Sequence, residues 1–143
     1  MNRGRLTLCL VACLLGGAAD IVLAEAPSVA AGGRCVELRT YTAAPGKLDA
    51  LHARFRNHTL SLFKKHGIEV VGFWVPMAAA DGAGEKLIYL LAHKSREAAD
   101  ASWKAFRADP DWVAAKKASE TDGPLTTKVE SVFLAPTDYS PMK

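Results

Sequence analysis

Four short stretches of the chain have the pattern or the composition of β-strands. They run over residues 36–42, 68–75, 86–93 and 128–134, and the first and the last alternate between two unlike faces. In the first stretch Val36 and Leu38 share one face, whereas Arg39 and Tyr41 share the other. We expect the Val36 and Leu38 face to lie against the core.

Apolar residues at helical spacing predict one long helix over residues 47–66. The stripe consists of Leu48, Leu51, Phe55, Thr59 and Leu62. Gly67 follows, and glycine commonly closes a helix because it adopts a positive φ angle at little cost.

Residues 95–120 predict two further helices separated by a proline. Ser95 is the expected N-cap of the first helix, which brings Trp103 to the core. Asp109 is the expected N-cap of the second helix, and Pro110 suits its first turn.

The predicted order of elements is therefore β-α-β-β-α-β, with a hairpin between the second and third strands. This is the α+β, ferredoxin-like arrangement, a four-stranded antiparallel sheet with its helices on one face. We expect the other face to carry Arg39, Tyr41, Trp74 and Tyr89. Because such a face is too aromatic to stay comfortably in water, we also expect two sheets to pair in a homodimer.

A chain of 143 residues, half of them hydrophobic, suits one globular domain. Its formal net charge is +3, and the basic residues are interspersed with acidic ones. This charge pattern does not indicate nucleic-acid binding.

Residues 1–24 read as a secretory signal peptide, and residues 25–34 as a flexible lead-in. Arg3 and Arg5 precede an apolar run that is too short to span a membrane comfortably, so no transmembrane segment is expected in the mature chain. Export to the periplasm or outside the cell is the first interpretation. A lipoprotein anchored at Cys13 and a mitochondrial presequence are the alternatives.

Arg39 and Tyr41 are candidates for holding a carboxylate or an enolate, because Arg offers a planar fork of donors and Tyr a hydroxyl. The alternative is that Arg39 has only a structural role and forms an ion pair with Glu37 or Glu130 across the sheet or the dimer. Likewise, His58 is either a general base or haem ligand, or a partly buried histidine without a chemical role.

Aromatic residues supply the rest of the predicted site, although core packing alone explains Trp103. The expected ligand-binding residues are Arg39, Tyr41, His58, Thr59, Trp74, Tyr89 and Trp103, with His58, Arg39 and Tyr41 as catalytic candidates. No metal site is expected, because His52, His58 and His66 are too far apart along their helix. The sequence does not identify a cofactor.

Several short strings together resemble the NIPSNAP family across residues 35–141. They are VELRTY at 36–41, PGK at 45–47, FRNHT at 55–59, VGFW at 71–74, SWKAF at 102–106, DPDW at 109–112 and TDYSP at 137–141. The resemblance implies a dimeric α/β barrel, in which two ferredoxin-like subunits join their sheets. It also implies a biochemical activity that is largely unassigned.

The first functional hypothesis is an exported homodimer that binds a small apolar or aromatic ligand, or a protein partner. The alternative is an enzyme of the dimeric α/β-barrel group, either a cofactor-free or haem-linked monooxygenase or an isomerase. A purely structural module is the third possibility, and it predicts a subunit interface without a cavity.

Overall fold

The structure, a computed structural model, describes residues 34–142. The predicted signal peptide, its alternatives and the lead-in up to residue 33 lie outside the described residues. Along the chain the elements are β1 (Cys35–Ala43), α1 (Leu48–Arg54), η1 (Phe55–Thr59), α2 (Leu60–Lys65), β2 (Glu69–Trp74), η2 (Ala79–Asp81), β3 (Lys86–His93), α3 (Arg96–Ala108), α4 (Pro110–Ser119) and β4 (Thr126–Leu134). None of the helices in this part of the chain has the length and hydrophobicity to cross a membrane.

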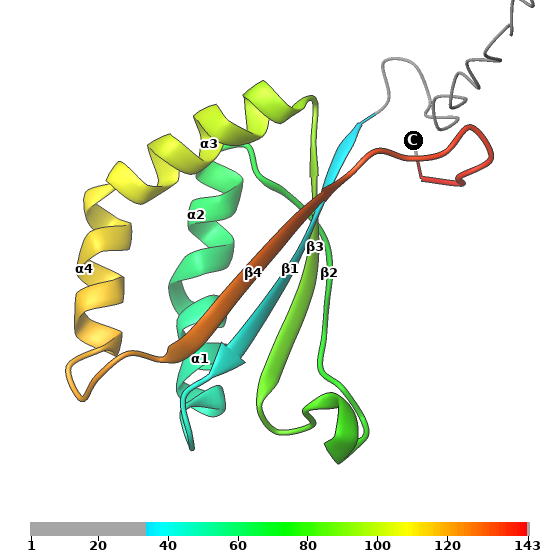
Figure 1. Cartoon of the computed structure of the whole chain (residues 1–143). Helices are drawn as coiled ribbons and strands as arrows, with labels where there is room; N and C mark the ends of the chain where they lie inside the picture. Colours follow the sequence, from blue (N-terminus) through cyan, green and yellow to red (C-terminus); the bar gives the residue numbers. More distant parts are fainter. Residues whose placement is uncertain (1–33, 143) are drawn as a thin grey trace, which may run out of the picture.

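The four strands form one antiparallel sheet in the order β2-β3-β1-β4. All the α-helices lie on one side of this sheet and leave the other side uncovered (Figure 1). The predicted α+β, ferredoxin-like fold is thereby confirmed.

The first predicted helix is one continuous rod, but its middle turn, η1, is a π-helix. The Leu60 N–H bonds the carbonyl of Phe55 five residues back, and the Thr59 hydroxyl donates to the Arg54 carbonyl at 3.3 Å. A π turn inserts one extra residue and rotates the side chains that follow it. Arg54, immediately before this turn, pairs with Glu120 at the C-terminal end of α4, at 2.8 Å.

The second helical region follows the prediction closely. Ser95 Oγ accepts the Ala98 N–H at 3.1 Å, and Asp109 Oδ1 accepts the Asp111 N–H at 2.8 Å, so both predicted N-caps are present. Asp109 also accepts from His66 Nε2 at 2.7 Å. Because His66 lies at the end of α2, the Asp109 carboxylate links α2 to α4 and also caps the N-terminus of α4.

The two faces of the sheet are the reverse of the expected assignment. Arg39, Tyr41 and Tyr89 lie under the helices, where Tyr89 is fully buried. The face that the helices leave open carries an aliphatic patch, with Thr40, Thr42, Lys86, Lys128 and Glu130 beside it. Pairing register places on it Val36 and Leu38 from β1, Ile88 and Leu90 from β3, Val132 and Leu134 from β4, and Trp74 from β2.

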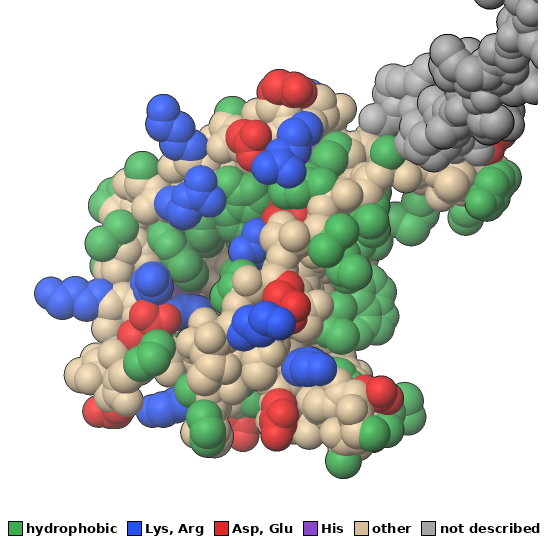
Figure 2. All heavy atoms as spheres, in the orientation of Figure 1, with side chains coloured by type: hydrophobic (Ala, Val, Ile, Leu, Met, Phe, Trp, Pro, Cys, Tyr) green, Lys and Arg blue, Asp and Glu red, His purple; other side chains and the backbone are tan. Residues whose placement is uncertain are grey.

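Trp74 is the one predicted open-face residue that the structure does place there, and it is 52% exposed. Its ring lies across Gly72, where an added Cβ would come within 2.7 Å of the indole. Figure 2 shows hydrophobic side chains gathered on the side of the sheet away from the helices, at the right of the view, while charges of both signs are interspersed elsewhere.

Candidate functional site

A buried carboxylate organises the helix-covered side of the sheet. Glu37, on β1, is fully buried and accepts four hydrogen bonds. The donors are Arg39 Nη1 at 2.5 Å, Trp103 Nε1 at 2.6 Å, Ser131 Oγ at 2.6 Å and His93 Nε2 at 3.1 Å. We call these five residues, with Tyr41 and Tyr89, the Glu37 cluster.

Arg39 is engaged through all three of its nitrogens. Nε donates to the Tyr89 hydroxyl at 2.9 Å and Nη2 to the Tyr41 hydroxyl at 3.3 Å, while Nη1 is bound to Glu37. The guanidinium also lies 4.4 Å from the centre of the Trp103 ring, within the range of a cation–π contact. Burial raises the pKa of Tyr89 well above its ordinary value, so this phenol stays protonated.

These contacts explain why charged residues lie on the covered face. A buried charge is tolerated when it is paired and its hydrogen-bonding groups are satisfied. Glu37 and Arg39 meet that condition by contacting each other and residues on β3, β4 and α3. Arg39 therefore has the structural role that was the alternative to ligand binding, and its ion-pair partner is Glu37. Glu130, the other partner considered, pairs with Lys128.

The cluster predicts a loss of stability in acid. Burial alone would raise the pKa of Glu37, but the bonds from His93, Ser131, Trp103 and Arg39 outweigh it and lower the pKa from 4.5 to about 2. The folded protein therefore binds this proton more weakly than the unfolded chain, and stability is present above pH 4.5 and lost as pH falls towards 2. We expect a loss of about 3 kcal/mol from this group.

Urea unfolding between pH 6 and pH 2.5 measures this loss. Glu37→Gln has no carboxyl at this position, so its stability should fall less steeply over the same interval. Equal slopes for the wild type and the variant would contradict the assignment to Glu37.

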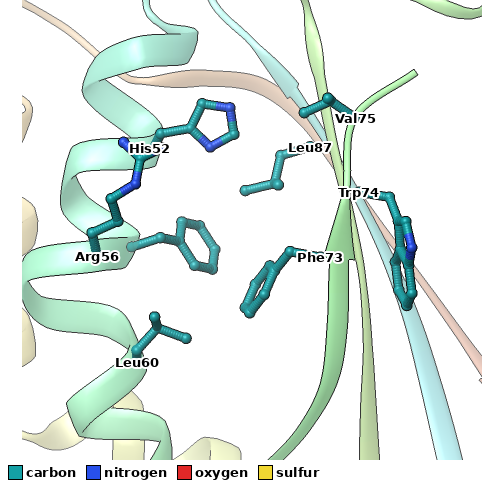
Figure 3. A pocket seen from close by; sticks show the side chains of 8 residues that line it. His52, Arg56, Leu60, Phe73, Trp74, Val75 and Leu87 are labelled. Carbon is teal, nitrogen blue, oxygen red and sulfur yellow. The ribbon is translucent and has the colours of Figure 1, made fainter. Parts of the chain in front are cut away.

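A cavity of about 270 Å³ lies beside the Glu37 cluster, between the first helical rod and the β2 side of the sheet. Its lining residues are His52, Phe55, Arg56, Leu60, Phe73, Trp74, Val75 and Leu87. Phe55 packs edge-on against Phe73, with 5.5 Å between the ring centres, and in Figure 3 Phe73 and Leu87 project from the strands towards the helix that carries Leu60. The interior is therefore apolar, and His52 and Arg56 supply its polar groups.

Phe55 connects the cavity to the cluster. This ring lines the cavity and makes edge contacts with Tyr41 at 5.9 Å and Tyr89 at 5.4 Å between ring centres. Phe73, on β2, lies 5.2 Å from Tyr89 between ring centres. The cluster thus supports both aromatic rings from behind.

The structure divides the predicted ligand-binding residues between several places. Arg39, Tyr41, Tyr89 and Trp103 meet in the Glu37 cluster, and Trp74 is at the rim of the cavity with its ring turned to the open sheet face (Figure 3). Thr59 is buried, with its hydroxyl bonded to the Arg54 carbonyl. His58 is exposed and lines a shallow surface groove against α4.

The cavity contains residues that the sequence analysis did not select. His52 and Arg56 lie four positions apart, so they project from the same side of a helix, and this spacing was the available signal. Phe55 was expected only as part of the core stripe. Among residues 34–142, no three His, Cys, Asp or Glu side chains lie close enough together to hold a metal ion.

The family model described as NIPSNAP matches residues 36–141 of this chain. No protein with a curated functional description matches it in sequence. Solved structures do resemble it. A NIPSNAP family protein of unknown function from Agrobacterium tumefaciens aligns with a TM-score of 0.68 and 20% identity, over 81% of this chain and 99% of that one.

Two further structures show the range of the likeness. A NIPSNAP-like domain protein from Burkholderia xenovorans aligns with a TM-score of 0.66 and 17% identity, over 77% of this chain and 90% of that one. A candidate antibiotic biosynthesis monooxygenase from Bacteroides thetaiotaomicron aligns with a TM-score of 0.55 and 16% identity, over 80% and 98% of the two chains. At these identities the likeness shows the shared fold.

Proposed function

This chain belongs to the NIPSNAP family, and from that premise we propose that it is an exported homodimer that binds a small apolar or aromatic ligand in each subunit. The observation that carries the proposal is the cavity between η1 and β2, about 270 Å³ in volume. Ligand cavities commonly measure roughly 300–1,000 Å³ and have apolar walls with a few polar groups. The size of this cavity suits a ligand of one or two rings.

Binding is favoured over catalysis by the chemistry of the lining. Of the eight lining residues, His52 alone is of a type that commonly serves as a general acid or base. Arg39 and Tyr41, the other candidates for chemistry, are held within the Glu37 cluster. The monooxygenase likeness concerns the fold, which hosts many functions.

The homodimer is supported by the open face of the sheet. Trp74, Val132 and Leu134 are each more than 40% exposed there, and Val36, Leu38, Ile88 and Leu90 lie between them. An apolar patch that runs from β2 to β4 across a sheet is typical of a face that another protein surface covers. A second copy of the same sheet offers a matching aliphatic surface. Export rests on the predicted signal peptide at residues 1–24.

Filling the cavity tests the binding function. Leu60 lines the cavity and is 39% exposed, so Leu60→Trp extends a larger ring into the cavity without creating a void in the core. Calorimetric titration with 2-naphthamide, a neutral two-ring probe, should show binding to the wild type that weakens by at least about tenfold in this variant.

Val113→Trp is the matched control, because Val113 is 54% exposed on α4 and does not line the cavity. It should bind 2-naphthamide as the wild type does. Equal weakening by both substitutions, or no binding to the wild type up to the solubility limit of the probe, would refute a binding function for this cavity.

A further inference from the structure

The two polar residues of the cavity lie at one end of an otherwise apolar lining. His52 lies on α1, and Arg56 follows it by four residues in η1, so both project from the helical wall opposite β2. In Figure 3 the Arg56 side chain extends along the helix towards His52, while the aromatic and aliphatic side chains occupy the space between helix and strand. One end of a ligand would therefore meet donors and the rest would meet only carbon.

Arg56 has no acidic partner within the part of the chain that the structure describes. Its neighbour Arg54 pairs with Glu120, and Arg39 pairs with Glu37, but none of the ion pairs among residues 34–142 includes Arg56. The positions three and four residues away on the helix carry Ala53, Thr59, His52 and Leu60, none of them acidic.

None of the eight residues that line the cavity is acidic either. The end of the cavity at Arg56 is therefore positively charged and uncompensated. A guanidinium binds a carboxylate through two parallel N–H···O bonds, and such charge-assisted bonds are stronger than neutral ones. An imidazole N–H beside it can donate to the same group.

We propose that the ligand is an organic carboxylate whose apolar or aromatic body fills the cavity and whose carboxylate is bound by Arg56, with His52 as a second donor. This inference rests on the proposed binding function and specifies its ligand class. Phe55 and Phe73 contact the flat faces or edges of the body, and Leu60 and Leu87 limit its width. The cavity would thus select a ligand with a negative charge at the Arg56 end and an apolar body that fits between the aromatic and aliphatic side chains.

A pair of probes of nearly equal shape tests the charge preference. 2-Naphthoate and 2-naphthamide differ mainly in the negative charge, and calorimetric titration gives the dissociation constant of each. Since Arg56 is exposed to solvent, which weakens an ion pair, we expect 2-naphthoate to bind the wild type about tenfold more tightly. Arg56→Gln should abolish this difference.

Arg107→Gln removes the same charge from an exposed position on α3 outside the cavity, and should retain the preference. Equal affinities of the two probes for the wild type would overturn the carboxylate assignment and leave the binding function standing. A preference that survives in Arg56→Gln would overturn it as well, because the carboxylate would then lie elsewhere. Failure of both probes to bind the wild type would remove the inference and the proposed function together.

Discussion

Replacing Glu37 by Gln should lower the free energy of unfolding by about 3–5 kcal/mol, because removing one member of a buried ion pair leaves the other charge uncompensated. Arg39 would lose its anionic partner, and the Trp103 and Ser131 donors would face a neutral amide in place of a carboxylate. The NH2 group of the introduced Gln side chain is itself a hydrogen-bond donor, and it would face one of these donors without an acceptor between them. Urea unfolding at pH 7 measures the loss.

Glu130→Gln is the matched control for this measurement. Glu130 lies on β4, on the open face of the same sheet. Its side chain is 48% exposed in the single subunit, whereas that of Glu37 is 1% exposed. Its surface pair with Lys128 should contribute no more than about 1 kcal/mol. A Glu37→Gln variant as stable as Glu130→Gln would show that the Glu37 cluster does not hold the sheet to its helices.

Replacing Val132 by Lys should convert the proposed homodimer to monomers. Val132 is 52% exposed on the open face in the single subunit, so the substitution places no charge in the core. In a symmetric dimer the same position occurs twice, and each lysine would lose water on association. We expect the dimer dissociation constant to rise by at least about a hundredfold, measured by analytical ultracentrifugation.

The same strand supplies the control. Val129 is 47% exposed and pairs with Tyr41, so it lies on the helix side of β4, while Val132 pairs with Leu38 on the open side. Val129→Lys should therefore leave the dimer intact. A wild-type protein that sediments as a monomer at tens of micromolar, or equal dissociation by both variants, would contradict pairing through the open face.

Local patterns predicted the elements of this fold well. Ser95 and Asp109 are N-caps, and Gly67 closes α2 with a φ of 69°. The helical stripe also held, with Leu51, Phe55, Thr59 and Leu62 all buried. These features depend on neighbours a few residues apart, so the sequence contains the information directly.

The assignment of the two sheet faces was wrong, and the reason lies in long-range pairing. Val36 and Leu38 form the more apolar face of β1, and hydrophobicity alone places that face in the core. The partners that satisfy Glu37 come from residues 56 to 94 positions away, namely His93, Trp103 and Ser131. No local pattern in the sequence shows that the buried Glu37 carboxylate will accept hydrogen bonds from residues on three other elements.

The candidate site was predictable only in part for the same reason. Trp74 was selected for its exposure and does line the cavity, but His52 and Arg56 become ligand-facing through the packing of the helical rod against β2. The π turn at Phe55–Thr59 is not indicated by the spacing of the stripe. His58, chosen at the edge of the stripe, is exposed at the surface.

The central claim is that a small ligand binds between η1 and β2, and methyl NMR of the labelled protein during a 2-naphthamide titration tests it most directly. The account predicts saturable shifts at the methyl groups of Leu60, Val75 and Leu87, which line the cavity, and little change at Val113 or Val132. Shifts that gather at Val132 and the open sheet face, or methyl signals that do not move at all, would contradict it.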